Sequence, residues 1–349
     1  MQKKILTNIV WIRLFLVVLL VFYHSFAIYS GSWTPIEGFP RVNSYIWMAR
    51  LSYAFMLEMF VFVSGYIFGF QVRTKGKEKL QFKNLFWSKF KRLMIPSIIF
   101  SAIYIFMFRN EYQHPLHEIL YYIIAGTGHL WFLSMLFWCF IFLWCLESLK
   151  IGHRIALPIL LVLSIFSFIP LPFHMTNTLY YMLFFYVGYI LQRKDINVES
   201  YIKPKYALIC SVLFVVLFIL LITLRANVSE YSSGWTNPII SKILYLSYCN
   251  FSKITYASIG LSATFIWVCI YDRNKKGKLT QKVLDISGLC MGVYVFQQFI
   301  LKALYYHTPL PSALGPYWLP WIGFTIALLA SLVLSWLLHK TKIGRMLIG

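Results

Sequence analysis

Residues 11–25 read Trp-Ile-Arg-Leu-Phe-Leu-Val-Val-Leu-Leu-Val-Phe-Tyr-His-Ser, and they indicate what kind of chain this is. Apolar residues extend this stretch to residues 9–30, which is long enough for one helix to cross a bilayer. The stretch nevertheless contains Arg13 and His24. An ionisable side chain at mid-membrane costs at least about 2.5 kcal/mol on insertion scales, so both residues need a reason to be there.

The composition of the whole chain agrees with a membrane environment. Of its 349 residues, 60% are hydrophobic and 12% are charged, against roughly 25% charged in an ordinary soluble domain. A globule this apolar could not cover its surface with polar groups, which excludes a soluble enzyme. The same composition excludes a disordered chain and a disulfide-rich scaffold.

Ten apolar stretches are candidates for membrane-spanning helices. They lie at residues 9–30, 47–70, 93–109, 129–147, 155–171, 178–191, 206–224, 253–271, 286–305 and 317–339. Residues 237–252 fit either an interfacial helix or an early start of the eighth span. The opening Met-Gln-Lys-Lys leads into an apolar run without a small-residue cleavage site, so the first span is expected to be uncleaved.

The net charge of +21 follows the positive-inside pattern of membrane proteins. With a cytoplasmic N-terminus, 24 of the 32 Lys and Arg residues fall in cytoplasmic segments, and the outer loops hold Arg41, Arg109 and Arg225. The sequence therefore predicts an all-α polytopic protein of the plasma or inner membrane, with ten transmembrane helices and both termini cytoplasmic. Residues 1–349 are expected to form a single integral-membrane domain with no soluble appended domain. The basic charge is assigned to topology and not to nucleic acid.

The cysteines point to packing and not to chemistry. None of the six has a metal or redox spacing, and all fall in or beside apolar spans. They are Cys139, Cys145, Cys210, Cys249, Cys269 and Cys290. We expect them to pack in the core, and we expect no metal site.

Arg13 and His24 are eleven residues apart, which is three helical turns plus only about 20°. Their side chains therefore share one face of the predicted helix, separated along its axis by about 16 Å. One stripe thus carries a fixed cation near the cytoplasmic boundary and a titratable base in the outer half. Taken alone, Arg13 also fits a side chain that snorkels to the inner headgroups, and His24 fits a packed interfacial histidine.

The second span contains Glu58 and then Phe-Val-Phe-Val-Ser-Gly-Tyr at residues 60–66. Gly65 is expected to let another helix approach closely. An intramembrane glutamate normally faces a partner or a water-filled cavity. Glu58 is therefore a candidate for holding a histidine and stabilising the imidazolium that forms when this base takes a proton.

The fourth span opens with Gly-His-Leu-Trp-Phe-Leu at residues 128–133. Trp131 fits an anchor at the membrane interface. His129 fits two roles equally well. It is either another interface anchor or a polar residue that lines an outward-facing acceptor site. We therefore carry His129 and Trp131 as acceptor-side candidates.

A basic run, residues 73–92, separates the second and third spans and contains eight Lys or Arg residues with one acid. Topology and attraction to anionic lipids explain part of this run. Its end, with Lys89, Lys91 and Arg92, also fits a phosphate dock at the cytoplasmic mouth of a cavity, because these side chains make charge-assisted hydrogen bonds to phosphate.

These motifs together resemble the membrane-bound acyltransferase 3 family. The resemblance rests on Arg-x10-His at residues 13–24, Glu-Met-Phe-Val-Phe-Val-Ser-Gly-Tyr at 58–66, the basic stretch ending at Pro96, His-Leu-Trp-Phe-Leu at 129–133 and Leu-Phe-Phe-Tyr-Val-Gly-Tyr at 183–189. It covers nearly the whole chain.

The resemblance implies ten helices and transfer of an acyl group, usually acetyl, from cytoplasmic acyl-CoA to a hydroxyl of an extracytoplasmic glycan or lipid-linked sugar. It implies that His24 is the catalytic base, that Glu58 occupies the family's acidic position, and that Arg13 holds the CoA end of the donor. The family often has a histidine where residues 294–298 read Tyr-Val-Phe-Gln-Gln. Gln297 cannot titrate, so an acid–base role at that position is in doubt.

A multi-pass transporter or exporter of a glycan or small acid is the competing class. Ten helices, a midplane carboxylate and intramembrane prolines fit a transporter as well. Against it, no inverted repeat is visible and no acidic relay accompanies Glu58. A purely structural membrane protein would leave Arg13 and His24 unexplained. Substrate flux without dependence on acyl-CoA would distinguish the transporter.

Overall fold

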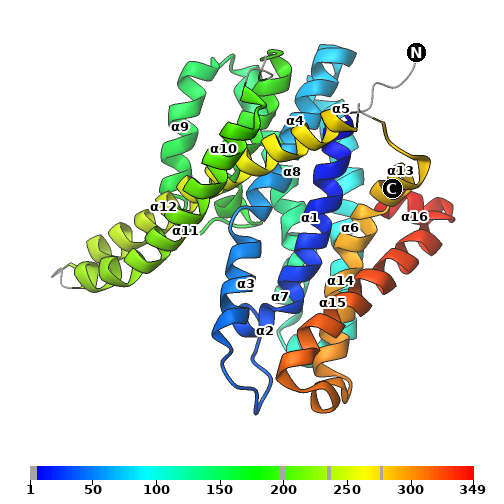
Figure 1. Cartoon of the computed structure of the whole chain (residues 1–349). Helices are drawn as coiled ribbons and strands as arrows, with labels where there is room; N and C mark the ends of the chain where they lie inside the picture. Colours follow the sequence, from blue (N-terminus) through cyan, green and yellow to red (C-terminus); the bar gives the residue numbers. More distant parts are fainter. Residues whose placement is uncertain (1–5, 197, 199–200, 234–236, 276–277) are drawn as a thin grey trace. The chain divides into compact units, whose positions relative to one another are not determined.

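The computed structural model describes residues 6–196, 198, 201–233, 237–275 and 278–349. These residues form helices and no strand, which confirms the all-α class (Figure 1). The chain divides into two compact units: residues 1–56 together with 271–349 form the terminal unit, and residues 57–270 form the central unit.

Three long helices make up most of the terminal unit: α1 (Thr7–Ser25), α14 (Cys290–Tyr306) and α15 (Leu310–His339). α14 and α15 form a hairpin, and α1 packs against both of them (Figure 1). Two short helices, α2 (Ala27–Ser30) and α3 (Asn43–Tyr53), follow the end of α1. This end of α1 is therefore surrounded by helices that come from both ends of the chain.

The start and the end of α1 are both tied to C-terminal segments. Thr7 donates a hydrogen bond of 2.6 Å to Asp272 at one end, and at the other the Tyr305 hydroxyl donates to the carbonyl of Ser25 at 2.8 Å. Because Tyr305 lies at the end of α14, α1 and α14 run in the same direction. The unit is completed by α13 (Gln281–Gly288), which meets α14 at a bend of 52°, and by α16 (Lys342–Ile348).

The central unit contains the remaining helices, and α12 carries the chain back into the terminal unit. They are α4 (Met56–Lys75), α5 (Phe82–Lys89), α6 (Ile95–Met107), α7 (Leu116–Ala125), α8 (Trp131–Ser148), α9 (His153–Ile165), α10 (Met175–Arg193), α11 (Pro204–Ser233) and α12 (Pro238–Asn274). α10 packs against α8 and α9, and α6 packs against α7.

Glycines bring α4 and α10 into backbone contact. A Cβ atom at Gly65 would lie 2.0 Å from the carbonyl oxygen of Phe185, and one at Gly188 would lie 2.2 Å from that of Phe62. Gly69 meets Tyr189 in the same way one turn further on, so the two helices run in the same direction. The close approach predicted at Gly65 is confirmed.

The helix α12 resolves the ambiguity before the eighth span. It is one continuous helix of 37 residues that begins at Pro238. The residues before 253 are thus the early start of the eighth helix and not a separate interfacial helix. α11 lies against it in the opposite direction, with hydrogen bonds from Arg225 to the Tyr245 hydroxyl (2.9 Å) and from Trp267 to the Ser211 hydroxyl (3.1 Å).

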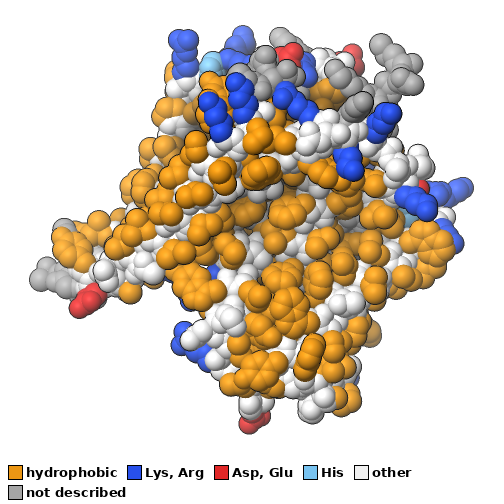
Figure 2. Space-filling view, in the orientation of Figure 1, with side chains coloured by type: hydrophobic (Ala, Val, Ile, Leu, Met, Phe, Trp, Pro, Cys, Tyr) orange, Lys and Arg blue, Asp and Glu red, His pale blue; other side chains and the backbone are white. Residues whose placement is uncertain are grey.

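Each of the ten predicted spans contains a helix, although α9 ends at Ile165 within the fifth, and not all of these helices pass as membrane spans. In the described part of the chain, seven are long and apolar enough, and the bent α13–α14 pair brings the number to eight. The apolar helix α9 has only 13 residues, and α10 has 19 residues with several polar side chains. Hydrophobic side chains cover much of the visible helix surface (Figure 2), so a multi-pass membrane protein is supported, while the number ten stays a prediction.

Candidate functional site

His24 lies in the last turn of α1 and is 8% exposed. Its ring stacks almost parallel to the ring of Trp33, with centroids 5.9 Å apart and planes 18° apart. The neighbouring Tyr23 ring lies 5.1 Å from it on the helix itself. The predicted base is therefore enclosed by aromatic side chains, which limit the access of water to the imidazole.

Hydrogen bonds hold the segment that carries Trp33 in place. The hydroxyls of Tyr23 and Ser32 are 2.7 Å apart, and the Tyr306 hydroxyl donates to the carbonyl of Thr34 at 2.6 Å. Trp33 also meets the ring of Tyr305, at 6.2 Å between centroids. The indole is thus fixed from both sides by neighbours in the terminal unit, so its position over His24 is built into the fold.

Arg13 occupies the opposite part of α1 and is half-buried. Its guanidinium donates a hydrogen bond of 3.2 Å to the carbonyl of Ser287, in the last turn of α13. The last carbonyls of a helix have no partner within the helix, so a cation is well placed there. Arg13 therefore stabilises the bend between α13 and α14, and its guanidinium has further N–H groups for a ligand.

Gln297 is completely buried on α14. Its amide nitrogen donates to the carbonyl of Tyr294 at 3.4 Å, and its amide oxygen has no hydrogen-bond partner among the described residues. An unsatisfied buried acceptor costs free energy, so this oxygen is suited to a water or to a ligand donor.

Glu58 belongs to the central unit and is fully buried. One of its carboxylate oxygens is 3.1 Å from the ammonium of Lys253 and accepts a hydrogen bond of 3.1 Å from the Tyr180 hydroxyl. The other oxygen has no hydrogen-bond partner among the described residues. Glu58 thus holds α4, α10 and α12 together around a compensated charge.

Lys253 was missed as a site residue by sequence reasoning. It stands at the first position of the predicted span 253–271, where a lysine at a helix end is ordinary. Because α12 begins at Pro238, before the predicted span, Lys253 lies inside the helix and not at its end. The packing of α12 against α4 then brings Lys253 to Glu58, which the sequence does not indicate.

His129 and Trp131 lie at the start of α8 in the central unit. His129 is buried, with its ring 6.3 Å from that of Tyr104, and Trp131 is half-buried. The Trp131 ring contacts His174 at 5.8 Å. Burial lowers the pKa of His174 below its ordinary value, against a smaller opposing effect from a hydrogen bond with the Gly126 backbone. His174, in the loop before α10, was not noticed in the sequence because no motif surrounds it.

The three residues of the predicted phosphate dock differ in their surroundings. The Lys89 ammonium lies 3.9 Å from the ring centre of Phe140 and 4.9 Å from that of Phe68. Cation–π contacts with these two rings therefore stabilise its positive charge. Lys91 and Arg92 are exposed.

Lys91 and Arg92 lie on a π-helical turn, Phe90–Met94. Pro96 explains this turn, because its ring would collide with the carbonyl four residues earlier in a regular α-helix, and its nitrogen cannot donate. The wider turn relieves the collision, and such turns are frequent at functional sites.

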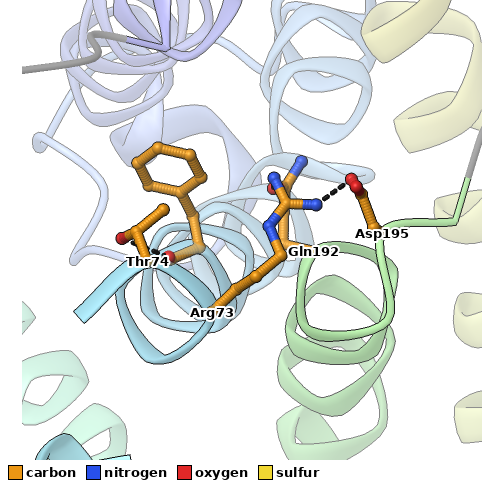
Figure 3. A network of polar contacts seen from close by, with 5 residues as sticks. Arg73, Thr74, Gln192 and Asp195 are labelled. Atoms are coloured by element: carbon orange, nitrogen blue, oxygen red, sulfur yellow. Dashed lines mark hydrogen bonds and ion pairs between the residues drawn. The ribbon is translucent and has the colours of Figure 1, made fainter. Parts of the chain in front are cut away.

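Arg73, at the start of the basic run, is used structurally. At the end of α4 its guanidinium pairs with Asp195 and donates to the Gln192 side chain at 3.1 Å, next to the end of α10 (Figure 3). The contact secures the two helices beyond their glycine interface.

The described part of the chain contains no group of three His, Cys, Asp or Glu side chains that could hold a metal ion. The cysteines are free: Cys139, Cys269 and Cys290 are buried, and the other three are half-buried. The residues predicted as a site thus fall into two sets, with Arg13 and His24 in the terminal unit and the others in the central unit.

Comparisons with known proteins add a family. A family model described as an acyltransferase domain matches residues 6–340, which includes nearly all of both units. Neither a search of curated proteins nor a search of solved structures found a match.

Proposed function

Because this chain belongs to the acyltransferase 3 family and is a membrane acyltransferase, we propose that its donor is cytoplasmic acyl-CoA and its acceptor an extracytoplasmic sugar hydroxyl. The transferred group is acetyl in the simplest case. The acceptor is a glycan or a lipid-linked sugar, and the location is the plasma or inner membrane. The observation that supports this most is the buried imidazole of His24, stacked on Trp33 at the end of an apolar helix.

The proposed chemistry is general base catalysis by His24. One ring nitrogen takes the proton of the acceptor hydroxyl while the hydroxyl oxygen attacks the thioester carbonyl. The carbon–sulfur bond then breaks, and the CoA thiolate leaves with the proton that the imidazolium returns. The aromatic enclosure favours this transfer because excluding water suppresses hydrolysis of the thioester.

Arg13 and the π-helical turn are the proposed donor contacts. Arg13 and His24 are separated by about 16 Å along α1, which is comparable to the pantetheine arm of CoA. Lys91 and Arg92 are exposed, so CoA phosphates can reach their side chains. Lys89 was predicted to join them, and the aromatic faces around its ammonium support a packing role for it instead.

The proposed topology has ten spans with both termini cytoplasmic. Within each unit, the relative directions of the helices agree with an alternating path through the membrane. The first and ninth spans (α1 and α14) are parallel, as are the second and sixth (α4 and α10), and the seventh and eighth (α11 and α12) are antiparallel.

Binding of acetyl-CoA to the purified chain tests the function. We compare wild type, Arg13→Gln, His24→Ala and, as a control, His117→Ala at an exposed histidine of α7. Arg13→Gln is expected to weaken binding about tenfold, the equivalent of one charge-assisted contact. His24→Ala is expected to bind acetyl-CoA normally and to lose about 10²–10⁴-fold in transfer of labelled acetyl to envelope polymer.

The transporter alternative gives different results in the same experiment. A folded wild type that binds no acetyl-CoA, or that moves a substrate across vesicles independently of acyl-CoA, would remove the donor and favour transport. Unchanged acetyl transfer in His24→Ala would remove the base.

A further inference from the structure

A cavity of about 360 Å³ opens in the terminal unit directly beyond the end of α1. It is formed by α2, by the loop that follows and by α3. Its lining includes the aromatic rings of Tyr29 and Phe39, the hydroxyl of Ser30, and the side chains of Arg41 and Arg50. A volume above about 300 Å³, with apolar walls and a few polar groups, is typical of sites for small ligands.

The two arginines give the lining of this cavity a positive charge, and the lining contains no Asp or Glu side chain. Arg41 and Arg50 are exposed on its lining, and neither makes an ion pair within the described part of the chain. The Arg50 guanidinium lies 5.7 Å from the ring centre of Trp47 on its own helix. By contrast, Arg225, also predicted to lie outside, donates to Tyr245.

These cations stand on the side of the membrane where basic residues are scarce. The proposed topology places this loop outside, where positive residues are depleted relative to the cytoplasmic side. Two guanidiniums that line one cavity, without a carboxylate partner, are therefore suited to an anion, and their planar donor sets match a carboxylate or a phosphate.

The walls of the cavity are suited to a sugar ring. The Tyr29 ring is held in place by a hydrogen bond from its hydroxyl to the carbonyl of Pro316 and by a ring contact with Tyr45. Rigid aromatic faces bury the apolar C–H faces of sugars at little cost in side-chain entropy. The cavity also lies next to the base in the chain, because Ile28 of its lining is four residues from His24.

We infer that this cavity binds the carboxylate or phosphate group of an acidic sugar residue in the acceptor glycan. The inference rests on the proposed function, which supplies the acceptor, and it makes that acceptor an anionic polymer. Arg41 and Arg50 hold the acid, and Tyr29 and Phe39 pack against the ring. The segment that carries Trp33 over His24 also borders the cavity through Gly31 and Pro35, so an occupied cavity lies beside the entrance to the base.

Calorimetric titration of the full-length chain in detergent, without any donor, tests this inference. The probes are an oligogalacturonate, a hexose 6-phosphate, a neutral oligosaccharide of the same length as the first, and glycerol phosphate as a lipid-headgroup probe. The variants are Arg41→Gln, Arg50→Gln and the double variant. Arg109→Gln is the matched control, because Arg109 is also predicted to lie outside but does not line the cavity.

Wild type and Arg109→Gln are expected to bind an anionic probe and not the neutral one. Each single variant is expected to weaken this binding about tenfold, and the double variant more strongly, because each removes one charge-assisted contact. Whether the uronate or the phosphate probe binds more tightly identifies the acid. Gel filtration of each variant shows that it remains folded.

Equal binding of neutral and anionic probes, absence of binding, or a double variant with wild-type affinity would overturn the inference. So would binding confined to glycerol phosphate, which would indicate a lipid headgroup. Titration of the same samples with acetyl-CoA separates the two proposals. A chain that binds acetyl-CoA but no acidic sugar contradicts only the cavity assignment, and the reverse result contradicts only the donor.

Discussion

His24 is positioned by aromatic neighbours, because its ring stacks on that of Trp33 and lies 5.1 Å from that of Tyr23. The Trp33 ring keeps water from one face of the imidazole and limits the orientations of the imidazole ring. The predicted support from Glu58 stays a prediction, since that carboxylate has its own partners in Lys253 and Tyr180.

Replacement of Trp33 tests its role over His24. Trp33→Ala is expected to lower acetyl transfer about tenfold with little change in acetyl-CoA affinity, because it opens the imidazole to water without touching the donor contacts. Trp33→Phe keeps a ring at this position and is expected to retain most of the activity. The measurement is kcat for acetyl transfer beside calorimetric binding of acetyl-CoA. Equal loss in both variants would assign Trp33 to the acceptor and not to enclosure.

Charge balance between Glu58 and Lys253 is expected to be important for stability. Lys253→Met leaves a fully buried carboxylate without its cation, which typically costs about 3–5 kcal/mol. The double variant Glu58→Gln/Lys253→Met removes both charges and is expected to recover most of the stability. Thermal unfolding in detergent measures both. A single variant as stable as wild type would show that the ion pair contributes nothing.

At the scale of helices, the packing of α4 on α10 depends on glycine. An added Cβ at Gly65 would meet a backbone carbonyl at 2.0 Å, and a backbone cannot move aside like a flexible side chain. Gly65→Ala is therefore expected to destabilise the chain by about 1–3 kcal/mol or more, as overpacking does. Gly288→Ala is the control, since nothing lies within 4 Å of the added atom. Unfolding midpoints that fall equally in both variants would contradict the packing argument.

The π-helical turn before α6 is a second feature at this scale, and it carries the exposed side chains of Lys91 and Arg92. It follows from Pro96, so a local sequence rule explains it. The same rule does not explain Lys89, whose ammonium lies between rings of α4 and α8. Neighbouring basic residues in one run thus have different uses, and only the packing of helices distinguishes them.

At the scale of the whole molecule, the orientation in the membrane is open to a direct test. Glu37 lies in the loop predicted outside and Lys79 in the loop predicted inside, and both side chains are exposed. In intact cells, a membrane-impermeant thiol reagent is expected to label Glu37→Cys and not Lys79→Cys. The native cysteines are buried or half-buried, and the unsubstituted chain serves as the background. Labelling of Lys79→Cys alone would reverse the proposed topology.

The sequence by itself determined the helical membrane class, the family resemblance and the shared face of Arg13 and His24. It also determined the close approach at Gly65. These features follow from composition, from the period of a helix and from the size of single residues, so they are local. The family match over residues 6–340 confirms the resemblance.

Only the tertiary structure decided which side chains meet. It joined Glu58 to Lys253, turned Lys89 onto aromatic rings, placed Trp33 over His24 and opened the cavity at Arg41 and Arg50. It also made α12 one continuous helix through residues 238–252. In a chain this apolar, many faces of many helices are equally able to pack. The choice among them depends on the combined fit of segments far apart in sequence, which local patterns do not contain.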